Sequence, residues 1–93
     1  MTAFVYVLSN DRNNVLYVGS TDDLGKRMYF HKRGLLKGFT ERYNVKKLVY
    51  IESHSDIMAA RKREKAIKGG SRKKKVLLIT SQNPHWKDLG VTS

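Results

Sequence analysis

Two short segments that favour β-structure, joined by a cluster of turn-forming residues, constrain the fold of this chain more than any other feature. Residues 3–8 (AFVYVL) and 15–19 (VLYVG) are rich in aromatic and β-branched side chains, which are enriched in strands. Serine, asparagine and aspartate dominate residues 9–14 (SNDRNN), and these residue types are frequent in turns. We therefore predict a β-hairpin.

Each predicted strand carries one central tyrosine, Tyr6 in the first strand and Tyr17 in the second. Side chains alternate between the two faces of a sheet along each strand. If the turn centres on Asp11 and Arg12, the two tyrosines lie opposite one another, and both rings share a face.

A helix pattern and a third strand follow the hairpin. Residues 20–23 (STDD) supply N-cap candidates for a helix that runs to about Lys32, with Gly34 as its C-terminal stop. Residues 38–40 (GFT) begin a short segment of undefined structure, and residues 46–52 (KKLVYIE) are typical of a strand.

Two further helices complete the chain. Residues 55–56 (SD) cap a helix that runs to about Lys68 and ends at the glycines of residues 69–70. Ser71 then caps a basic helix that runs to Ile79.

The element order is strand, strand, helix, strand, helix, helix. This order predicts an α+β fold, with a small three-stranded antiparallel sheet and helices packed against it. A chain of 93 residues has material for one hydrophobic core. We expect one domain over residues 1–80 and a tail, residues 81–93, packed on the same domain.

The charge balance indicates a polyanionic partner. The chain has 19 Lys and Arg against 8 Asp and Glu, a formal net charge of +11. So many positive charges repel one another in a compact fold and destabilise it. Nucleic acid is the first candidate for a partner that would relieve this repulsion. The alternative is a surface whose charge serves solubility alone.

Composition also excludes several classes of site and location. Cysteine is absent, which excludes disulfides and thiolate metal sites. No apolar run approaches the roughly 20 residues that span a bilayer, and the N-terminus does not have the pattern of a signal peptide. We therefore expect a cytoplasmic protein that does not enter a membrane.

Polar residues interrupt the apolar stripe of the first helix. Leu24, Met28 and Leu35 recur at helical spacing. His31 falls on the same stripe and Arg27 lies beside it, and these two residues are four apart and hence neighbours. A single histidine on an apolar face is commonly a hydrogen-bonded core residue, so this pattern alone leaves a structural role open.

A carboxylate interrupts the stripe of the second helix in the same way. Ile57, Ala60 and Ile67 define that stripe, and Glu64 stands among them. A partly buried carboxylate needs a cation, hydrogen bonds or a metal. An ion pair between Glu64 and Arg27 is the structural alternative to a functional site.

In order and spacing, these residues resemble the motifs of the GIY-YIG nuclease superfamily, most closely its small single-domain bacterial members. Tyr6, in a Val-Tyr-Val triplet, is followed eleven residues later by Tyr17, in a Tyr-Val-Gly triplet. Arg27 stands where the family carries its essential arginine, and His31 stands where many members have His or Tyr. Glu64 matches the metal-binding glutamate of the family.

The resemblance extends over nearly the whole chain. Gly19 closes the second triplet, and Asn83 is a looser match to an asparagine near the end of the domain; we regard both as supporting residues. The first triplet departs from Gly-Ile-Tyr, and Ser20 stands where some branches of the family have lysine.

The resemblance implies a catalytic set of five residues. Glu64 would hold one Mg²⁺ or Mn²⁺, hard cations that suit oxygen ligands. Tyr17 would be the general base, and Tyr6 would orient water or phosphate. Arg27 would clamp the phosphate with its planar fork, and His31 would relay a proton or hold Tyr17.

Basic residues on the helices are candidates for contacts with nucleic acid. The expected contacts are Lys26, Arg61, Lys65, Lys68, Arg72, Lys73 and Lys74. Tyr29, Phe30 and Phe39 could stack on unpaired bases, although core packing explains them at least as well.

The leading hypothesis is therefore a metal-dependent endonuclease that hydrolyses phosphodiester bonds in DNA, including structured or single-stranded DNA. One alternative is a non-catalytic nucleic-acid-binding module with the same fold. Another is a nuclease that acts on RNA, because both nucleic acids offer phosphates. The presence of all five predicted catalytic residues favours an enzyme, since a binding module does not require the complete set.

Overall fold

Three antiparallel strands form the centre of the computed structural model, which describes residues 2–33 and 42–90. The strands are β1 (Ala3–Ser9), β2 (Leu16–Thr21) and β3 (Lys47–His54). The order in the sheet is β2-β1-β3, so β1 is central and the other two strands are edges. Both pairings are antiparallel, as predicted.

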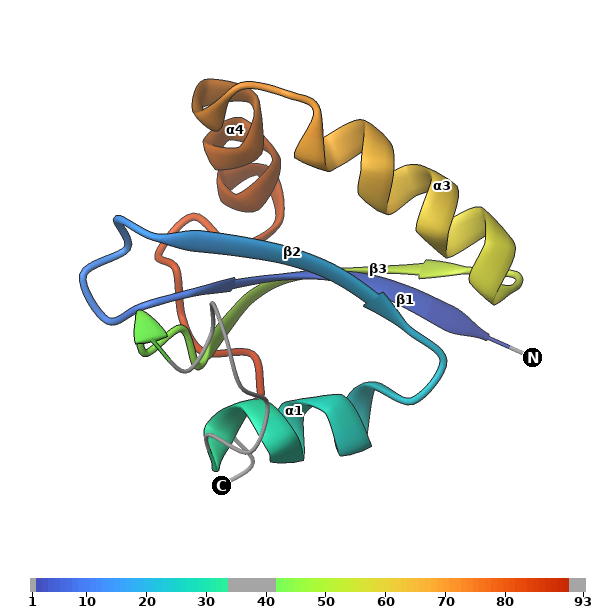
Figure 1. The fold of residues 1–93 in the computed structure, drawn as a ribbon. Helices are drawn as coiled ribbons and strands as arrows, with labels where there is room; N and C mark the ends of the chain where they lie inside the picture. Colours follow the sequence, from blue (N-terminus) through green and yellow to red (C-terminus); the bar gives the residue numbers. More distant parts are fainter. Residues whose placement is uncertain (1, 34–41, 91–93) are drawn as a thin grey trace.

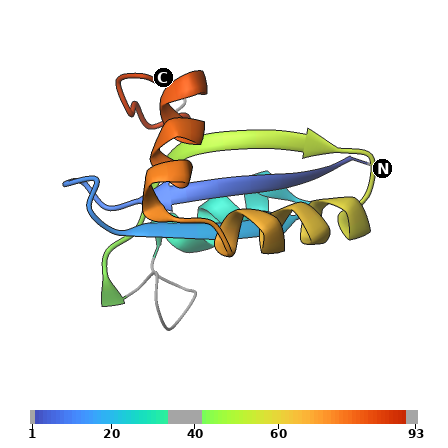
Figure 2. The same cartoon turned by 90° about the horizontal axis from the view of Figure 1, so that it is seen from above.

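Helices cover both faces of the sheet. Helix α1 (Leu24–Lys32) lies on one face, and α3 (Ile57–Lys68) and α4 (Arg72–Gln82) lie on the other (Figures 1 and 2). The predicted α+β class and element order are confirmed. In the described part of the chain, no helix has the length and apolar character needed to cross a membrane.

Strands β1 and β2 pair in a register two residues from the predicted one. Tyr6 pairs with Gly19, and Tyr17 pairs with Leu8, so the prediction that the tyrosines lie directly opposite is wrong. The turn is centred later in the chain than expected and accommodates Asn13 at a φ of 58°, which asparagine tolerates. A shift of two residues preserves the face, and the two rings lie side by side with centroids 6.4 Å apart.

Each described helix begins at a residue that the sequence marked as a cap. Asp23, Asp56 and Ser71 are the N-caps of α1, α3 and α4. Each side chain accepts a hydrogen bond from the backbone N–H three residues later, at 3.0, 2.8 and 3.2 Å. These bonds satisfy donors that a helix start leaves unpaired.

The ends of several elements differ from the prediction. Helix α4 continues beyond Ile79 to Gln82, because the hydroxyls of Thr80 and Ser81 bond back to carbonyls of the preceding turn and not to a cap. Strand β2 likewise continues through Thr21, which pairs with β1. The predicted helix stop at Gly34 and the segment at 38–40 lie outside the described residues.

The two faces of the sheet carry different cores. On the face covered by α3 and α4, the valines of β1 and β2 pack against Ala60, Ile67 and Ile79. On the face covered by α1, Tyr6 packs with Met28 and other apolar residues. The tyrosine-bearing face therefore belongs to α1.

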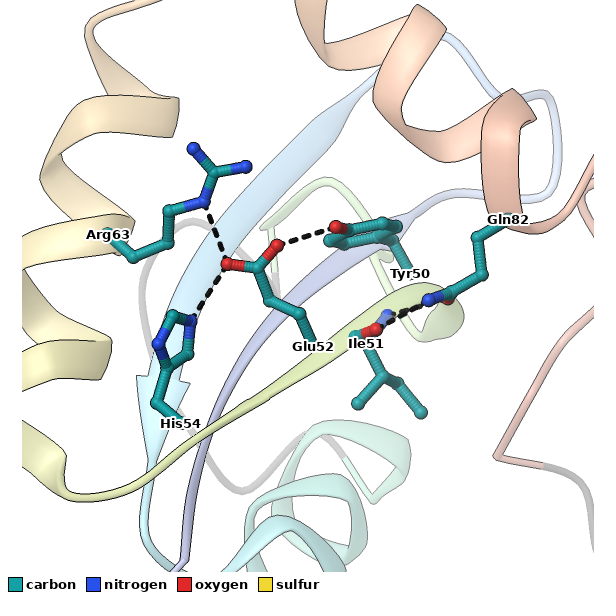
Figure 3. A network of polar contacts seen from close by, with 6 residues as sticks. All are labelled: Tyr50, Ile51, Glu52, His54, Arg63 and Gln82. Atoms are coloured by element: carbon teal, nitrogen blue, oxygen red, sulfur yellow. Dashed lines mark hydrogen bonds and ion pairs between the residues drawn. The ribbon is translucent and has the colours of Figure 1, made fainter.

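The segment after α4 covers the exposed edge of β3. The amide of Gln82 bonds both backbone groups of Ile51, at 3.0 and 2.7 Å (Figure 3). Leu48 donates its N–H to Asp88 and accepts a bond from Leu89 at 2.8 Å. An uncovered edge strand is a template for pairing with other chains, and these contacts occupy part of it.

Candidate active site

Three aromatic side chains meet on the face of the sheet that α1 covers. Tyr6 and His31 are buried, at 1% and 3% exposure, and the Tyr6 hydroxyl lies 3.3 Å from His31 Nε2. The ring of Tyr17 is partly buried and lies 5.7 Å from the His31 ring, centroid to centroid. We call these three residues the aromatic cluster.

Gly19 provides the space that the aromatic cluster needs. A Cβ atom at this position would lie 2.5 Å from the Tyr6 hydroxyl oxygen and 2.6 Å from Tyr6 Cζ, and 3.1 Å from Tyr17 Cε1. Any side chain would therefore displace Tyr6. The close approach of the Tyr6 hydroxyl explains why a glycine stands at this position, and a supporting role of Gly19 in the site stays a prediction.

Burial shifts the pKa values of the two buried members of the cluster in the direction that favours their uncharged forms. Burial, followed by the nearby Tyr17, raises the pKa of Tyr6 well above its usual value. Burial, followed by the positive charge of Arg27, lowers the pKa of His31 to about 4. His31 Nδ1 has no hydrogen-bond partner among the described residues. The ring therefore has an unused polar atom in a buried position, which is uncommon in folded proteins.

Arg27 lies next to this cluster on α1. Arg27 precedes His31 by four residues on the helix, and its positive charge lowers the pKa of His31 and opposes the rise in the pKa of Tyr6. It is partly buried, and it makes no hydrogen bond or ion pair with residues 2–33 or 42–90. A partly buried cation without a counter-ion has a strong tendency to bind an anion.

Glu64 approaches from the opposite face, on α3. Its carboxylate accepts a hydrogen bond from the Ser20 hydroxyl and forms an ion pair with Lys68, whose Nζ is 2.5 Å from Oε2. The burial of Glu64 opposes ionisation, but the bonds from Lys68 and Ser20 outweigh it, and the pKa is lowered. The alternative ion pair with Arg27 is not present, so Lys68 is the counter-ion.

Strand β2 lies between the aromatic cluster on one side and Glu64 on the other, and it contributes residues to both sides. The side chain of Tyr17 lies on the α1 side and that of Ser20 on the α3 side, as alternation along a strand requires. Gly19 has the same orientation as Tyr17, so a Cβ atom there would point toward the cluster. Lys68 Nζ bonds Glu64 and lies 6.0 Å from the centre of the Tyr17 ring. Of the five predicted catalytic residues, four therefore lie on the α1 side of the sheet, and Glu64 lies on the α3 side, next to the edge strand β2.

A second polar network lies on β3 and was not predicted from the sequence (Figure 3). The Glu52 carboxylate accepts hydrogen bonds from the Tyr50 hydroxyl, at 2.5 Å, and from Arg63 Nε, at 2.8 Å, and contacts His54 Nε2 at 2.9 Å. Burial opposes ionisation of Glu52, but these three bonds outweigh it and lower its pKa. Burial also raises the pKa of Tyr50 to about 12.

This network fixes the orientation of α3. Arg63 and Glu64 are adjacent on the helix, and they bond in different directions, Arg63 to Glu52 on β3 and Glu64 to Ser20 on β2. Two such contacts on neighbouring residues prevent rotation of the helix about its axis. Alternation along β3 places Tyr50, Glu52 and His54 on one face, which is the signal in the sequence that could have revealed this cluster.

The predicted nucleic-acid contacts occupy several environments. Arg61 and Lys65 line an open pocket together with Ser20 and Glu64. Lys73 and Lys74 are exposed at the start of α4, and Lys26 is exposed on α1; contact of these residues with nucleic acid stays a prediction.

Two further residues singled out in the sequence, Arg72 and Asn83, make contacts that hold the fold together. Arg72 donates to the backbone carbonyls of Asn13 and Asn14, at 2.8 and 3.1 Å, and so holds the hairpin turn against α4. Asn83 is buried and donates to the carbonyls of Val49 and Lys87. Asn83 is thus the C-cap of α4 and joins the following segment to β3.

Comparison with known proteins identifies the class to which this fold and site belong. The GIY-YIG catalytic domain matches residues 2–76, and the chain belongs to the GIY-YIG family. This is a nuclease family, so nucleic acid is the substrate class at the family level.

Two relatives share most of their length with this chain. The UPF0213 protein CPE1444 of Clostridium perfringens (strain 13 / Type A) is 35% identical over 80 residues, which cover 86% of this chain and 85% of that protein. The solution NMR structure of the UPF0213 protein BH0048 from Bacillus halodurans is 25% identical. It has a TM-score of 0.60 and covers 99% of this chain and 100% of its own.

Proposed function

We propose that this protein is a divalent-metal-dependent endonuclease that hydrolyses phosphodiester bonds in DNA. The observation that carries the proposal is the buried Tyr6–His31 contact beside Tyr17 and Arg27, which has no counter-ion among the described residues. Burying polar groups in this way costs stability compared with an apolar core. Placed next to the positive charge of Arg27, these groups are suited to binding and activating a phosphate ester.

Glu64 is the residue that we assign to Mg²⁺ or Mn²⁺. Within the described residues, no three His, Asp or Glu side chains form a group that could hold a metal. One carboxylate suffices for Mg²⁺ when water and substrate phosphate supply the other ligands. The Glu64 carboxylate already binds a cation, the Lys68 ammonium, so its environment suits positive charge. A bound divalent ion would stabilise negative charge on the phosphate and the leaving oxygen.

Tyr17 is a better candidate for the general base than Tyr6. Burial raises the pKa of Tyr6, so its hydroxyl stays protonated and is poorly suited to act as a base. Tyr17 is only partly buried and lies close to Lys68, which binds Glu64. A water molecule near the assigned metal ligand is therefore closer to the Tyr17 side of the cluster.

Arg27 and His31 would position the reacting groups. The guanidinium of Arg27 can bind two phosphate oxygens at once. His31, whose pKa of about 4 keeps it neutral at pH 7, holds the Tyr6 hydroxyl and does not add a second positive charge beside Arg27. The exposed cations of α3, Arg61 and Lys65, would contact the backbone of the nucleic acid.

The substitution Tyr17→Phe tests the proposal, because it removes only one hydroxyl. Cleavage should be measured in Mg²⁺ or Mn²⁺ on single-stranded, duplex and branched DNA and on RNA of the same sequence. The variant should lose about 100-fold or more of the cleavage rate and keep its affinity. Tyr43→Phe makes the same change at a tyrosine outside the predicted catalytic set and should cut like wild type.

Other outcomes would assign a different function. Equal cutting by wild type and Tyr17→Phe would exclude Tyr17 as the base. Binding without cutting by wild type on every substrate would favour the non-catalytic binding module. Faster cleavage of RNA than of DNA would show that RNA, and not DNA, is the substrate.

A further inference from the structure

The outer side of α1 carries an open pocket beside Arg27. The pocket is lined by Thr21, Asp22, Asp23, Lys26, Arg27 and Phe30. Lys26 and Phe30 are one helical turn apart, and Lys26 Nζ lies 6.0 Å from the centre of the Phe30 ring. The pocket thus combines two cations with one aromatic ring, directly beside the residue that we assign to the phosphate.

A second ring adjoins this pocket. Tyr29 is 50% exposed, and its ring packs edge-to-face with Phe30 at 5.7 Å between centroids. The guanidinium carbon of Arg33 lies 4.6 Å from the centre of the Tyr29 ring. Cations and rings therefore alternate along the outer side of α1, whereas its inner side carries the buried Met28. Surfaces of this composition bind single-stranded nucleic acid through phosphate contacts and base stacking.

We propose that this pocket binds the unpaired nucleotide next to the phosphate that is cut, with its base stacked on Phe30 and its phosphate held by Lys26 and Arg27. The inference rests on the proposed function, which assigns Arg27 to the phosphate. A paired base inside a duplex has both faces covered by its neighbours, so only an unpaired or extruded base can stack on Phe30. The substrate class is therefore nucleic acid that has unpaired nucleotides at the cut.

The two carboxylates of the pocket, Asp22 and Asp23, are suited to contact the base of the nucleotide and not its phosphate. Asp23 caps α1 and accepts a bond from the Lys26 backbone N–H at 3.0 Å, and Asp22 is exposed next to it. Carboxylates repel phosphate and accept hydrogen bonds from amino groups on bases. They therefore direct the phosphate toward Lys26 and Arg27, and they favour a base that carries an amino group over thymine or uracil.

A binding experiment without divalent metal tests this inference independently of cleavage. Wild type in EDTA is titrated into a single-stranded oligonucleotide that contains 2-aminopurine, whose fluorescence falls on stacking, and into the matching duplex. We expect quenching and tighter binding for the single strand. Phe30→Leu should abolish the quenching and weaken single-strand binding about 10-fold, with little change for the duplex.

Three further variants sharpen the experiment. Phe30→Tyr keeps a stacking ring and should restore the quenching that Phe30→Leu abolishes. Leu77→Ala, an exposed apolar residue of α4 on the other face of the sheet, should bind like wild type. Lys26→Gln should weaken binding to both the single strand and the duplex. The slope of log affinity against log salt concentration should fall by about the amount that one phosphate contact contributes.

The inference is overturned if wild type shows no quenching with the single strand, a result that does not depend on the folding of any variant. It is also overturned if Phe30→Leu weakens single-strand and duplex binding equally, or if it has no effect. Because no cleavage is involved, a protein that never cuts could still pass this test. Conversely, failure here would leave the assignment of Glu64 and Tyr17 intact.

Discussion

The hydroxyl of Tyr6 lies directly over the backbone of Gly19, where a Cβ atom would approach it to 2.5 Å. Tyr6 is held in place by the surrounding core and by its contact with His31, so it cannot simply rotate away. Tyr6 and Gly19 are also partners in the β1–β2 register. The position of the Tyr6 ring therefore depends on the absence of a side chain at residue 19.

Gly19→Ala should accordingly destabilise the protein and disturb the aromatic cluster. We expect a loss of about 1–3 kcal/mol in the free energy of unfolding, measured by urea denaturation, together with a loss of cleavage. Gly25→Ala is the matched control, because among residues 2–33 and 42–90 an added Cβ there meets only Asp23 Oδ1, at 3.9 Å. Since alanine favours a helix over glycine by about 1 kcal/mol, this control should be neutral or stabilising. Equal stability of the two variants would contradict the steric role of Gly19.

The lowered pKa of His31 predicts a loss of stability in mild acid. The pKa is about 4 in the folded protein and near 6.5 in the unfolded chain, so the unfolded chain binds more protons between these values. The contribution of His31 is complete above pH 6.5 and is lost as the pH falls toward 4. Between pH 6.5 and 5 the loss should be roughly 1.5 kcal/mol.

Urea denaturation of wild type and His31→Phe at pH 6.5, 5.75 and 5 measures this contribution. The variant cannot titrate at this position, and its stability should change less over the window than that of wild type. Parallel stability curves for the two proteins would show that His31 is not the group responsible.

If Glu64 holds a divalent ion as proposed, Lys68 competes with that ion for the carboxylate. Its ammonium lies 2.5 Å from Glu64 Oε2, so a divalent ion must displace it. Lys68→Met removes this competitor and should raise the affinity for Mn²⁺ in the absence of substrate by up to about fivefold, as expected for a half-exposed ion pair. Electron paramagnetic resonance of free Mn²⁺ provides the measurement, and Glu64→Gln serves as the non-binding reference. Weaker Mn²⁺ binding by Lys68→Met would mean that Lys68 supports the site.

The bond between Glu52 and Arg63 predicts that a residue far from the cluster affects the position of Glu64. Glu52→Gln keeps the size of the side chain and removes the charge that three donors share. We expect a loss of about 1–3 kcal/mol in unfolding free energy and weaker Mn²⁺ binding at Glu64. Asp11→Asn on the exposed turn serves as the charge-matched control. Unchanged metal binding in a destabilised Glu52→Gln would limit the network to a structural role.

The features of the fold that were predictable from the sequence are those that depend on local periodicity. The shared face of Tyr6 and Tyr17 follows from alternation, which a two-residue error in register does not disturb. The N-caps Asp23, Asp56 and Ser71 act within one turn, so each could be identified from its own neighbourhood.

The contacts that were missed join elements distant in sequence. Ser20 and Glu64 are separated by 44 positions, and Arg63 reaches Glu52 only because α3 crosses the sheet between β2 and β3. The ion pair between Glu64 and Lys68, in contrast, is local and could have been predicted, because Lys68 lies at the i+4 position on the same helix. The position of Glu64 on the opposite side of β2 from the aromatic cluster depends on the packing of α3, which no local pattern encodes.

The most direct test of the central claim is a cleavage assay with wild type and Glu64→Ala. Both proteins are incubated with single-stranded, duplex and branched DNA, with Mg²⁺, with Mn²⁺ and with EDTA, and binding is measured in parallel. We predict metal-dependent cutting by wild type that is lost in Glu64→Ala, with binding largely retained. Cutting by Glu64→Ala at a rate near wild type, or cutting that persists in EDTA, would contradict the account.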